Sequence, residues 1–306
     1  MSTSRSAPGR SHPYRQVPYL LNSLPGPLHH APLAFAHRGA DPTRENTMAA
    51  FRRAVQLGYR YLEIDVRTSA DGELVVFHDE TLDRITDGSG NLSDKTWAEL
   101  AELRVIGAGE EQARRRTSAG ELTDTAAASE APKPTPPPPA GEPLVRFSEA
   151  LQAFPDTHFN VDLKDAASVE PFVRIVEDHE AHQRVLVTSF NDSRRGRVRR
   201  RLTRPAAASA GWLTTARIVL LGPLSLAGGL SVDCVQVPVK RGRIRVVTER
   251  FIRRCHRAGL QVHVWVIDDP VQMHELLDLG VDGLMTDDAE ALAQVMRERS
   301  VWPQTD

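Results

Sequence analysis

Short apolar runs alternate with amphipathic stretches along most of the chain. The runs lie at 33–36, 61–66, 74–77, 158–164, 185–189, 206–210, 232–237, 262–267 and 283–286, and their lengths suit buried strands. Most stretches between them carry apolar residues at helical spacing. After Thr47, for example, Met48, Phe51 and Val55 predict a helix that ends at Gly58. Strands that alternate with helices in this way predict a parallel sheet covered by helices.

The number of strand candidates bears on the architecture. A closed TIM-type (β/α)8 barrel needs eight strands, whereas the pattern supplies nine. We therefore expect that one of 206–210 and 232–237 is not a full barrel strand. A doubly wound open sheet is the alternative, but no glycine-rich phosphate loop follows the first strand. The barrel is the fold that we predict.

The second and third predicted strands are joined by a short link. Residues 67–73 contain the turn signal Asp71-Gly72 and cannot hold the helix that usually joins parallel strands. We predict that the helix between strands 2 and 3 is missing and that the two strands are nevertheless parallel, because this keeps Glu63 and His78 at one edge of the sheet. The alternative is an antiparallel hairpin, which would place them at opposite ends.

Three segments fall outside the alternation and set the domain boundaries. Residues 1–31 are polar and contain five prolines, which predicts a mobile arm with a short apolar contact at 19–21. Residues 107–143 are rich in proline, alanine, glutamate and threonine and cannot bury enough apolar surface to fold alone. They predict a disordered insertion after the third strand, either inert or a proline-rich ligand for a partner. The barrel domain then spans 32–298, and 299–306 form a tail.

Composition narrows the class of protein. The 306 residues include 38 Lys and Arg and 40 Asp and Glu, for a net charge of −2, which gives no support for nucleic-acid binding. No apolar run reaches membrane-spanning length, and the absence of an apolar leader near residue 1 favours a cytoplasmic location. Cys234 and Cys255 are too few for a disulfide framework and are expected to be core thiols.

Positive charge is concentrated in one place. The segment Arg194–Arg204 contains seven arginines. Such a run could make a weak contact with an anionic membrane surface. It could equally be the solvated outer face of a barrel helix, and we favour this second interpretation.

Candidate chemistry gathers at the ends of the predicted strands. Glu63 and Asp65 are two apart on one strand and therefore share a face. Adjacent carboxylates repel unless a positive charge lies between them, and a hard cation such as Mg²⁺ or Ca²⁺ supplies one. On strand 158–164, Asp162 could add a third oxygen ligand and Lys164 a fixed positive charge. The alternative is that Glu63 and Asp65 simply form ion pairs with nearby arginines.

Two histidines and an arginine complete this group. His37 and His78 both end strands, where catalytic residues gather in a barrel, and they could act as general base and general acid on a phosphodiester. Arg38 suits bidentate binding of phosphate oxygens. Either histidine could instead be structural, or a metal ligand that would favour Zn²⁺ or Mn²⁺.

The order and spacing of these residues resemble the signature of the glycerophosphodiester phosphodiesterase family. The matching segments are His37-Arg38-Gly39, Glu45-Asn46-Thr47, Glu63-x-Asp65 and Val76-Phe77-His78-Asp79. Later segments that are also similar are Asn160–Lys164, Ser189-Phe190-Asn191, Val264-Trp265 and Gly280–Asp287. The resemblance spans about 33–295, apart from 107–143 and, more weakly, 203–231.

The resemblance implies a phospholipase-C-like phosphodiesterase barrel and gives roles to particular residues. It implies that His37 and His78 are the acid–base pair and that Glu63, Asp65 and position 162 bind a divalent cation. The family usually has Glu at that last position, and this chain has Asp162. The further residues implied are Arg38 and Lys164 as phosphate contacts, Trp265 and Phe190 as the pocket lining, and Glu45 as a support for Arg38.

The function expected from the resemblance is cation-dependent hydrolysis of a glycerophosphodiester to glycerol 3-phosphate and an alcohol. Attack could come from water directly or from the glycerol hydroxyl through a cyclic phosphate. One alternative is a lysophospholipase-D-like enzyme on the same barrel, which would need an apolar rim. Another is a catalytically silent phosphodiester-binding or scaffold protein. The expected partner is the small-molecule substrate alone.

Overall fold

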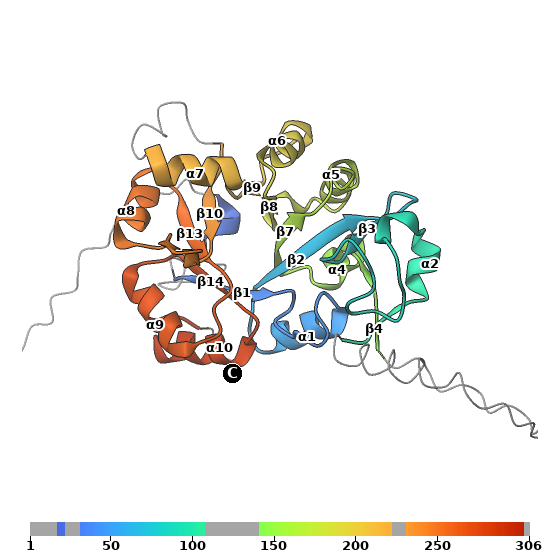
Figure 1. Cartoon of the computed structure of the whole chain (residues 1–306), viewed down its shortest axis with the longest axis horizontal. Coiled ribbons are helices and arrows are strands. Elements are labelled where there is room, and N and C mark those ends of the chain that lie inside the picture. Colours follow the sequence, from blue (N-terminus) through green and yellow to red (C-terminus); the bar gives the residue numbers. More distant parts are fainter. Residues whose placement is uncertain (1–16, 22–30, 108–140, 222–230, 303–306) are drawn as a thin grey trace, which may run out of the picture.

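The structure is a computed structural model, and it describes residues 17–21, 31–107, 141–221 and 231–302. Parallel strands form the barrel at its centre (Figure 1). Its path runs β10-β13-β14-β1-β2-β7-β8-β9, and a parallel bridge between Ser209 and Cys234 joins the two ends. The bounds are β1 (Leu33–His37), β2 (Tyr61–Thr68), β7 (His158–Leu163), β8 (Val185–Thr188), β9 (Ala207–Ala208), β10 (Cys234–Val237), β13 (Gln261–Val264) and β14 (Gly283–Thr286). The predicted TIM-type barrel is therefore confirmed.

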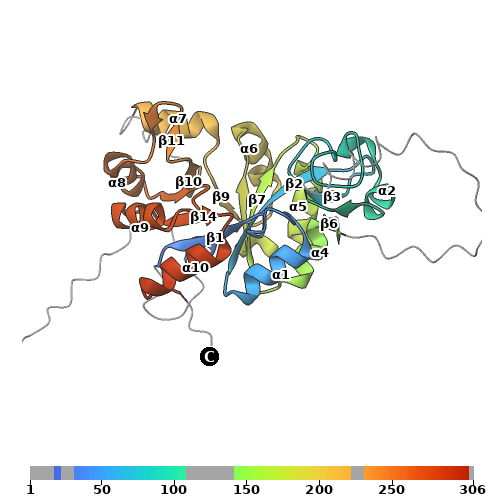
Figure 2. The same cartoon turned by 60° about the horizontal axis from the view of Figure 1, so that its bottom comes forward.

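Helices pack around the outside of the barrel (Figures 1 and 2). They are α1 (Met48–Gln56), α5 (Val169–Asp178), α6 (Asp192–Arg201), α7 (Trp212–Leu221), α8 (Glu249–Arg257), α9 (Pro270–Leu279) and α10 (Ala289–Glu298), with a 3₁₀ turn η4 (Ala181–Gln183). Thr47 caps α1 by accepting a hydrogen bond from Ala50 N, as its position in the sequence predicted. No helix in the described ranges is long and apolar enough to cross a membrane.

A smaller unit is inserted between β2 and β7 and projects from one side of the barrel (Figure 1). Its own buried cluster includes Val75, Phe77, Ile85 and Leu100. The elements are β3 (Leu74–Val76), the 3₁₀ turn η3 (Leu92–Asp94), α2 (Trp97–Ala101), β4 (Arg104–Val105), β5 (Glu142–Pro143) and β6 (Val145–Arg146). The helix that follows, α4 (Phe147–Ala153), belongs to the outer layer of the barrel, because Phe147 packs against Phe159 of β7 and stacks on Phe172 of α5. Most of the predicted disordered insertion, residues 108–140, lies outside the described residues.

Two details of the predicted strand arrangement were wrong. The segments 206–210 and 232–237 both supply barrel strands, and the ninth candidate, Leu74–Phe77, is the one outside the barrel. That segment is β3, which pairs antiparallel with β2, not parallel. Two adjacent strands joined by so short a link can form a hairpin but not a right-handed crossover. Because β3 is not a barrel strand, the insertion follows β2, the second strand of the barrel in chain order, and not a third barrel strand.

The hairpin nevertheless returns His78 to the carboxyl edge of the barrel. Strand β2 continues beyond its barrel partners to Thr68, which pairs with Leu74. Strand β3 then runs back along this extension, and Phe77 N donates a hydrogen bond to Asp65 O at 2.9 Å. His78 therefore follows directly beside Asp65, because β2 is long enough for the chain to turn back beyond the site.

The amino end of the barrel is filled by part of the predicted N-terminal arm. The 3₁₀ turn η1 (Pro18–Leu20) places Tyr19, which is fully buried, against the edge of the Tyr61 ring at 5.4 Å. The Tyr61 hydroxyl donates to Tyr19 O, and Gln261 Nε2 donates to Leu20 O. The predicted apolar contact at 19–21 is thus confirmed, while 1–16 and 22–30 lie outside the described residues.

Other predicted features are found in the cores. Cys234 and Cys255 are free, fully buried thiols, as expected. Trp302, which was predicted to belong to a tail, is instead buried. It packs edge-on against Tyr59 and donates a hydrogen bond from its indole to Leu57 O. Residues 303–306 lie outside the described part of the chain.

The substitution Tyr19→Ala should destabilise the protein by about 3 kcal/mol, because it removes a fully buried aromatic ring from the barrel. Tyr19→Phe is the matched control. The Tyr19 hydroxyl has no hydrogen-bond partner among the described residues, so Tyr19→Phe should change stability by less than about 1 kcal/mol. Urea unfolding measures both variants, and equal stability of Tyr19→Ala and wild type would refute the packing role.

Candidate active site

A sharp turn after β1 places the first two site residues. Arg38 has a left-handed backbone with φ of 51°, and Gly39 follows with φ of 88°. A Cβ on Gly39 would lie 2.7 Å from the Ala50 Cβ, so only glycine lets α1 pack this close. Arg38 N donates to Glu63 O at 2.9 Å, which ties the turn to β2. Left-handed non-glycine residues are uncommon and concentrate at functional sites.

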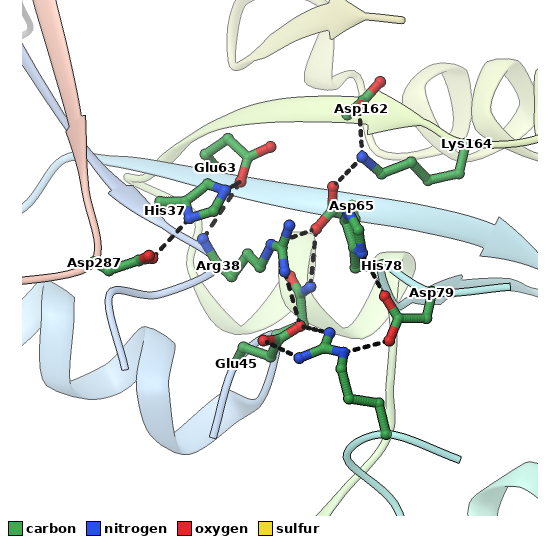
Figure 3. Close-up of polar contacts among 12 residues, drawn as sticks. His37, Arg38, Glu45, Glu63, Asp65, His78, Asp79, Asp162, Lys164 and Asp287 are labelled. Atoms are coloured by element: carbon green, nitrogen blue, oxygen red, sulfur yellow. Dashed lines mark hydrogen bonds and ion pairs between the residues drawn. The ribbon is translucent and has the colours of Figure 1, made fainter. Parts of the chain in front are cut away.

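His37 lies between two carboxylates (Figure 3). Its Nδ1 is 2.7 Å from Asp287 Oδ1, and its Nε2 is 3.8 Å from Glu63 Oε2. Burial alone would lower the pKa of His37, but the negative charge of Glu63 and the hydrogen bond to Asp287 outweigh it and raise that pKa above its ordinary value. Asp287 holds one ring nitrogen, so Nε2 is the nitrogen that faces the site.

The carboxylates of β2 are both buried but differ in their partners. Asp65 Oδ1 is 2.7 Å from Lys164 Nζ, and Asp65 Oδ2 is 2.9 Å from Arg38 Nε and accepts a hydrogen bond from Asn46 Nδ2. Burial raises the pKa of Asp65, but Lys164 and Arg38 outweigh it and lower that pKa overall. For Glu63, burial and then repulsion by Asp65 raise the pKa to about 7.

Strand β7, the neighbour of β2 in the barrel, contributes Asp162, and Lys164 follows this strand directly. Asp65 and Asp162 are register partners, so their side chains emerge side by side. Lys164 Nζ bridges them, at 2.7 Å from Asp65 Oδ1 and 2.6 Å from Asp162 Oδ2. Burial is the main cause of the raised pKa of Asp162. Lys164 therefore supplies the positive charge that two adjacent buried carboxylates require.

A chain of ion pairs connects Arg38 to His78 (Figure 3). Arg38 Nη1 binds Glu45 Oε1 at 3.0 Å, so the two residues are in contact. Glu45 also binds Arg84, whose Nε forms a short contact with Asp79. Asp79 Oδ1 in turn lies 2.6 Å from His78 Nδ1. Asp79 thus holds His78 through Nδ1, as Asp287 holds His37 through Nδ1. The second ring nitrogen of His78, Nε2, is not part of this contact.

Phe190 stands beside Lys164, and Trp265 packs against Phe190. Phe190 follows β8 and Trp265 follows β13, and their rings meet edge to face at 6.3 Å. Lys164 Nζ lies 6.0 Å from the Phe190 ring centre. Phe190 is 63% exposed, so it lies at the mouth of the site. Both predicted lining residues are therefore brought next to the charged cluster.

Comparisons with known proteins agree with this geometry. The model of the glycerophosphoryl diester phosphodiesterase family matches residues 37–291. A Mycobacterium tuberculosis protein named probable glycerophosphodiester phosphodiesterase 2 is 36% identical over 284 residues, which cover 90% of this chain and 94% of that protein. The chain belongs to the glycerophosphoryl diester phosphodiesterase family. It is accordingly an enzyme of the phosphoric diester hydrolase class.

Two further relatives support the family and the fold. A Caldanaerobacter subterraneus glycerophosphodiester phosphodiesterase is 27% identical, covering 87% of this chain and 98% of that protein. The solved structure of an Oleispira antarctica phosphodiesterase, in complex with the product sn-glycerol-3-phosphate, has a TM-score of 0.65 at 22% identity. It covers 87% of this chain and 97% of that chain. At this identity the second likeness shows the fold alone.

All the site residues predicted from the sequence gather at one edge of the barrel. The sequence analysis did not predict several residues that contact them. They are Asn46, Asp79, Arg84 and Asp287. Asp79 and Asp287 each stood inside a quoted segment, at the end of a strand, and their strand-end position was the available signal. Arg84 had none, because its link to Glu45 depends on how the inserted unit folds back.

Among the described residues, no group of three or more His, Cys, Asp or Glu side chains is arranged to hold a metal ion, and the predicted cation site stays a prediction. The charge of Lys164 lies between Asp65 and Asp162. The buried donor atoms still suit a hard cation. Among the described residues, Asp162 Oδ1 and Asn160 Oδ1 have no hydrogen-bond partner, and Glu63 has its pKa raised to about 7.

The raised pKa of Glu63 predicts a pH-dependent gain in stability for Glu63→Gln when cations are chelated. A buried carboxyl with a raised pKa favours folding below its unfolded pKa of 4.5, and this contribution is lost as pH rises through about 7. At pH 8 Glu63→Gln should therefore be more stable than wild type by up to about 3 kcal/mol, measured by urea unfolding with EDTA.

The control for this prediction is Glu102→Gln, which alters an exposed carboxylate and should leave stability within about 0.5 kcal/mol of wild type. At pH 4.5 the advantage of Glu63→Gln should largely disappear. A loss of stability in Glu63→Gln at pH 8 would show that Glu63 is stabilised by its surroundings as an anion, which contradicts the prediction.

Proposed function

We propose that the chain hydrolyses glycerophosphodiesters to glycerol 3-phosphate and an alcohol, with His37 and His78 as the acid–base pair and a divalent cation as cofactor. The single observation that carries the proposal is the matched environment of the two histidines. Each has its Nδ1 within 2.7 Å of a carboxylate oxygen, from Asp287 and Asp79 respectively. This arrangement fixes the ring and leaves Nε2 to exchange a proton with substrate or water.

The two histidines differ in their surroundings, which suggests a division of labour. His37 lies beside Glu63, and the resulting rise in its pKa favours the protonated form. A protonated imidazole can give a proton to a leaving oxygen, and a neutral one can take a proton from the attacking hydroxyl. We assign His37 and His78 to these two steps as a pair. Which one acts first depends on the orientation of the diester.

The phosphate would bind at Arg38 and Lys164. Both side chains are only partly exposed, at 17% and 15%, and both are fixed by carboxylates, so their positive ends are positioned before substrate arrives. Phosphate oxygens can then accept hydrogen bonds from groups that need little reorganisation. Phe190 and Trp265 would flank the alcohol part of the diester, because they form the exposed side of the same site.

The residues that would hold a Mg²⁺ or Ca²⁺ ion are Glu63, Asp65 and Asp162. Support comes from the donor chemistry, since the three carboxylates emerge from adjacent strands and oxygen donors are what these cations bind. A bound cation would polarise the phosphoryl oxygen. It would also replace part of the positive charge that Lys164 gives to Asp65 and Asp162, which frees the lysine for phosphate.

His37→Ala and His78→Ala should each lower kcat for release of glycerol 3-phosphate from glycerophosphocholine by about 10² to 10⁴. Neither should lower stability enough to unfold the protein, since both rings stand at strand ends. Release of glycerol 3-phosphate is measured with a coupled dehydrogenase assay. His274→Ala is the control, because His274 bonds Glu298 between the outer helices. Full activity in both site variants would disprove the assigned chemistry.

Chelation by EDTA should abolish hydrolysis, and added Mg²⁺ or Ca²⁺ should restore it. The variant Asp162→Asn should need roughly tenfold or more cation for half-maximal activity, because it removes a charged oxygen donor. Asp156→Asn is the control. Asp156 is exposed before β7, at the opposite end of the same strand, and its loss should not change the cation requirement. Activity that survives EDTA would refute the cofactor assignment.

A further inference from the structure

An exposed apolar and basic surface borders the active site. It is formed by the segments that follow β8, β9 and β10, and we call it the β8–β10 rim. Its apolar side chains are 46–68% exposed, and its basic side chains lie on the hairpin of β11 (Lys240–Arg241) and β12 (Ile244–Arg245). Its members are Phe190, Trp212, Leu213 and Ile244, with Lys240, Arg241, Arg243 and Arg245.

The rim is continuous with the substrate site. Phe190 stands beside Lys164 at one end, and its carbonyl accepts a hydrogen bond from Trp212 N. The guanidinium of Arg241 then lies 3.3 Å from the centre of the Trp212 ring. Arg241 pairs with Ile244 across the hairpin. Figure 2 shows β11 close to α7. The carboxyl-end loops of three successive strands thus extend the active-site face outward.

The charge on the hairpin of this rim is entirely of one sign. Between Cys234 and Thr248 the sequence contains Lys240, Arg241, Arg243 and Arg245 and no acidic residue. All four side chains are exposed. Exposed large apolar residues are unusual when they gather on one patch, and they then mark an interaction site. The combination of protruding apolar side chains and surrounding cations is the composition of segments that settle at a lipid headgroup layer.

We propose that the β8–β10 rim seats the active-site face of this enzyme on an anionic phospholipid surface. Leu213 and Ile244 would enter the headgroup layer, and the hairpin cations would contact anionic headgroups. A fluid interface accepts side chains from several separate loops without a complementary shape, which favours a bilayer over an acidic protein. The inference concerns where the enzyme works. It does not depend on the proposed cation or on the roles of the histidines.

The arginine-rich helix α6, by contrast, is mostly engaged with the protein itself. Arg194 and Arg199 donate to backbone carbonyls, Arg195 binds Asp192, and Arg201 binds Glu170. The run predicted as a possible membrane contact is therefore the outer face of a barrel helix. Its last residues also lie toward the amino end of the barrel, since the helix runs back from the carboxyl end of β8.

Vesicle binding tests the rim directly. The full chain is sedimented with vesicles of phosphatidylcholine containing roughly 30% phosphatidylglycerol, and with phosphatidylcholine alone, at low salt. Wild type should bind the anionic vesicles, and raising the salt should weaken binding. The double variant Lys240→Gln/Arg243→Gln should bind about 25-fold more weakly, at about fivefold per charge. Leu213→Asn/Ile244→Asn should lose about tenfold or more.

The matched control removes the same charge from α6 and the residues after it. Arg200→Gln/Arg204→Gln should bind anionic vesicles as wild type does. Hydrolysis of water-soluble glycerophosphocholine should be unchanged in all three variants, which verifies folding and separates this proposal from the proposed reaction. The proposal is overturned if wild type ignores anionic vesicles, if the rim variants bind as well as wild type, or if the α6 variant loses as much affinity.

Discussion

The buried carboxylate of Asp65 is the constraint on which the site depends. An ionised side chain inside a barrel is costly unless positive charge and hydrogen bonds surround it. Arg38, Lys164 and Asn46 meet that need from β7 and from the loop after β1. Each of these residues is thereby fixed in place before any substrate arrives. The strained turn at Arg38 is maintained by the same contacts, because its backbone also bonds β2.

A second set of ion pairs connects Arg38 to the inserted unit. Glu45 binds both Arg38 and Arg84, and Arg84 binds Asp79, which orients His78. The inserted unit therefore does more than cover one side of the barrel, since it supplies a histidine and the arginine that holds it. Networks of this kind are worth more together than their separate pairs suggest, so the barrel and the unit should behave as one functional body.

The opposite side of the site has a different character. There the loops after β8, β9 and β10 present aromatic and aliphatic side chains with surrounding arginines and a lysine. The site has fixed charged side chains on one side and exposed apolar side chains on the other. This difference would orient a bound substrate. A phosphodiester would bind with its phosphate toward Asp65 and its partners, and its alcohol toward Phe190 and Trp265.

The sequence by itself determined the barrel and the identity of the central residues. Apolar runs of strand length alternating with helical stretches specify a parallel barrel, and period-two spacing put Glu63 beside Asp65. The short link between β2 and β3 allows a hairpin and no crossover. Local pattern could not show that this hairpin returns His78 to the site, because that depends on the extension of β2 to Thr68. Nor could it pair Arg84 with Glu45, 39 residues away, or Asp287 with His37, 250 residues away. Pairs that distant depend on tertiary packing. Tertiary packing alone also decided that Lys164 forms an ion pair with Asp65, so that a cation is not the only positive charge near this carboxylate.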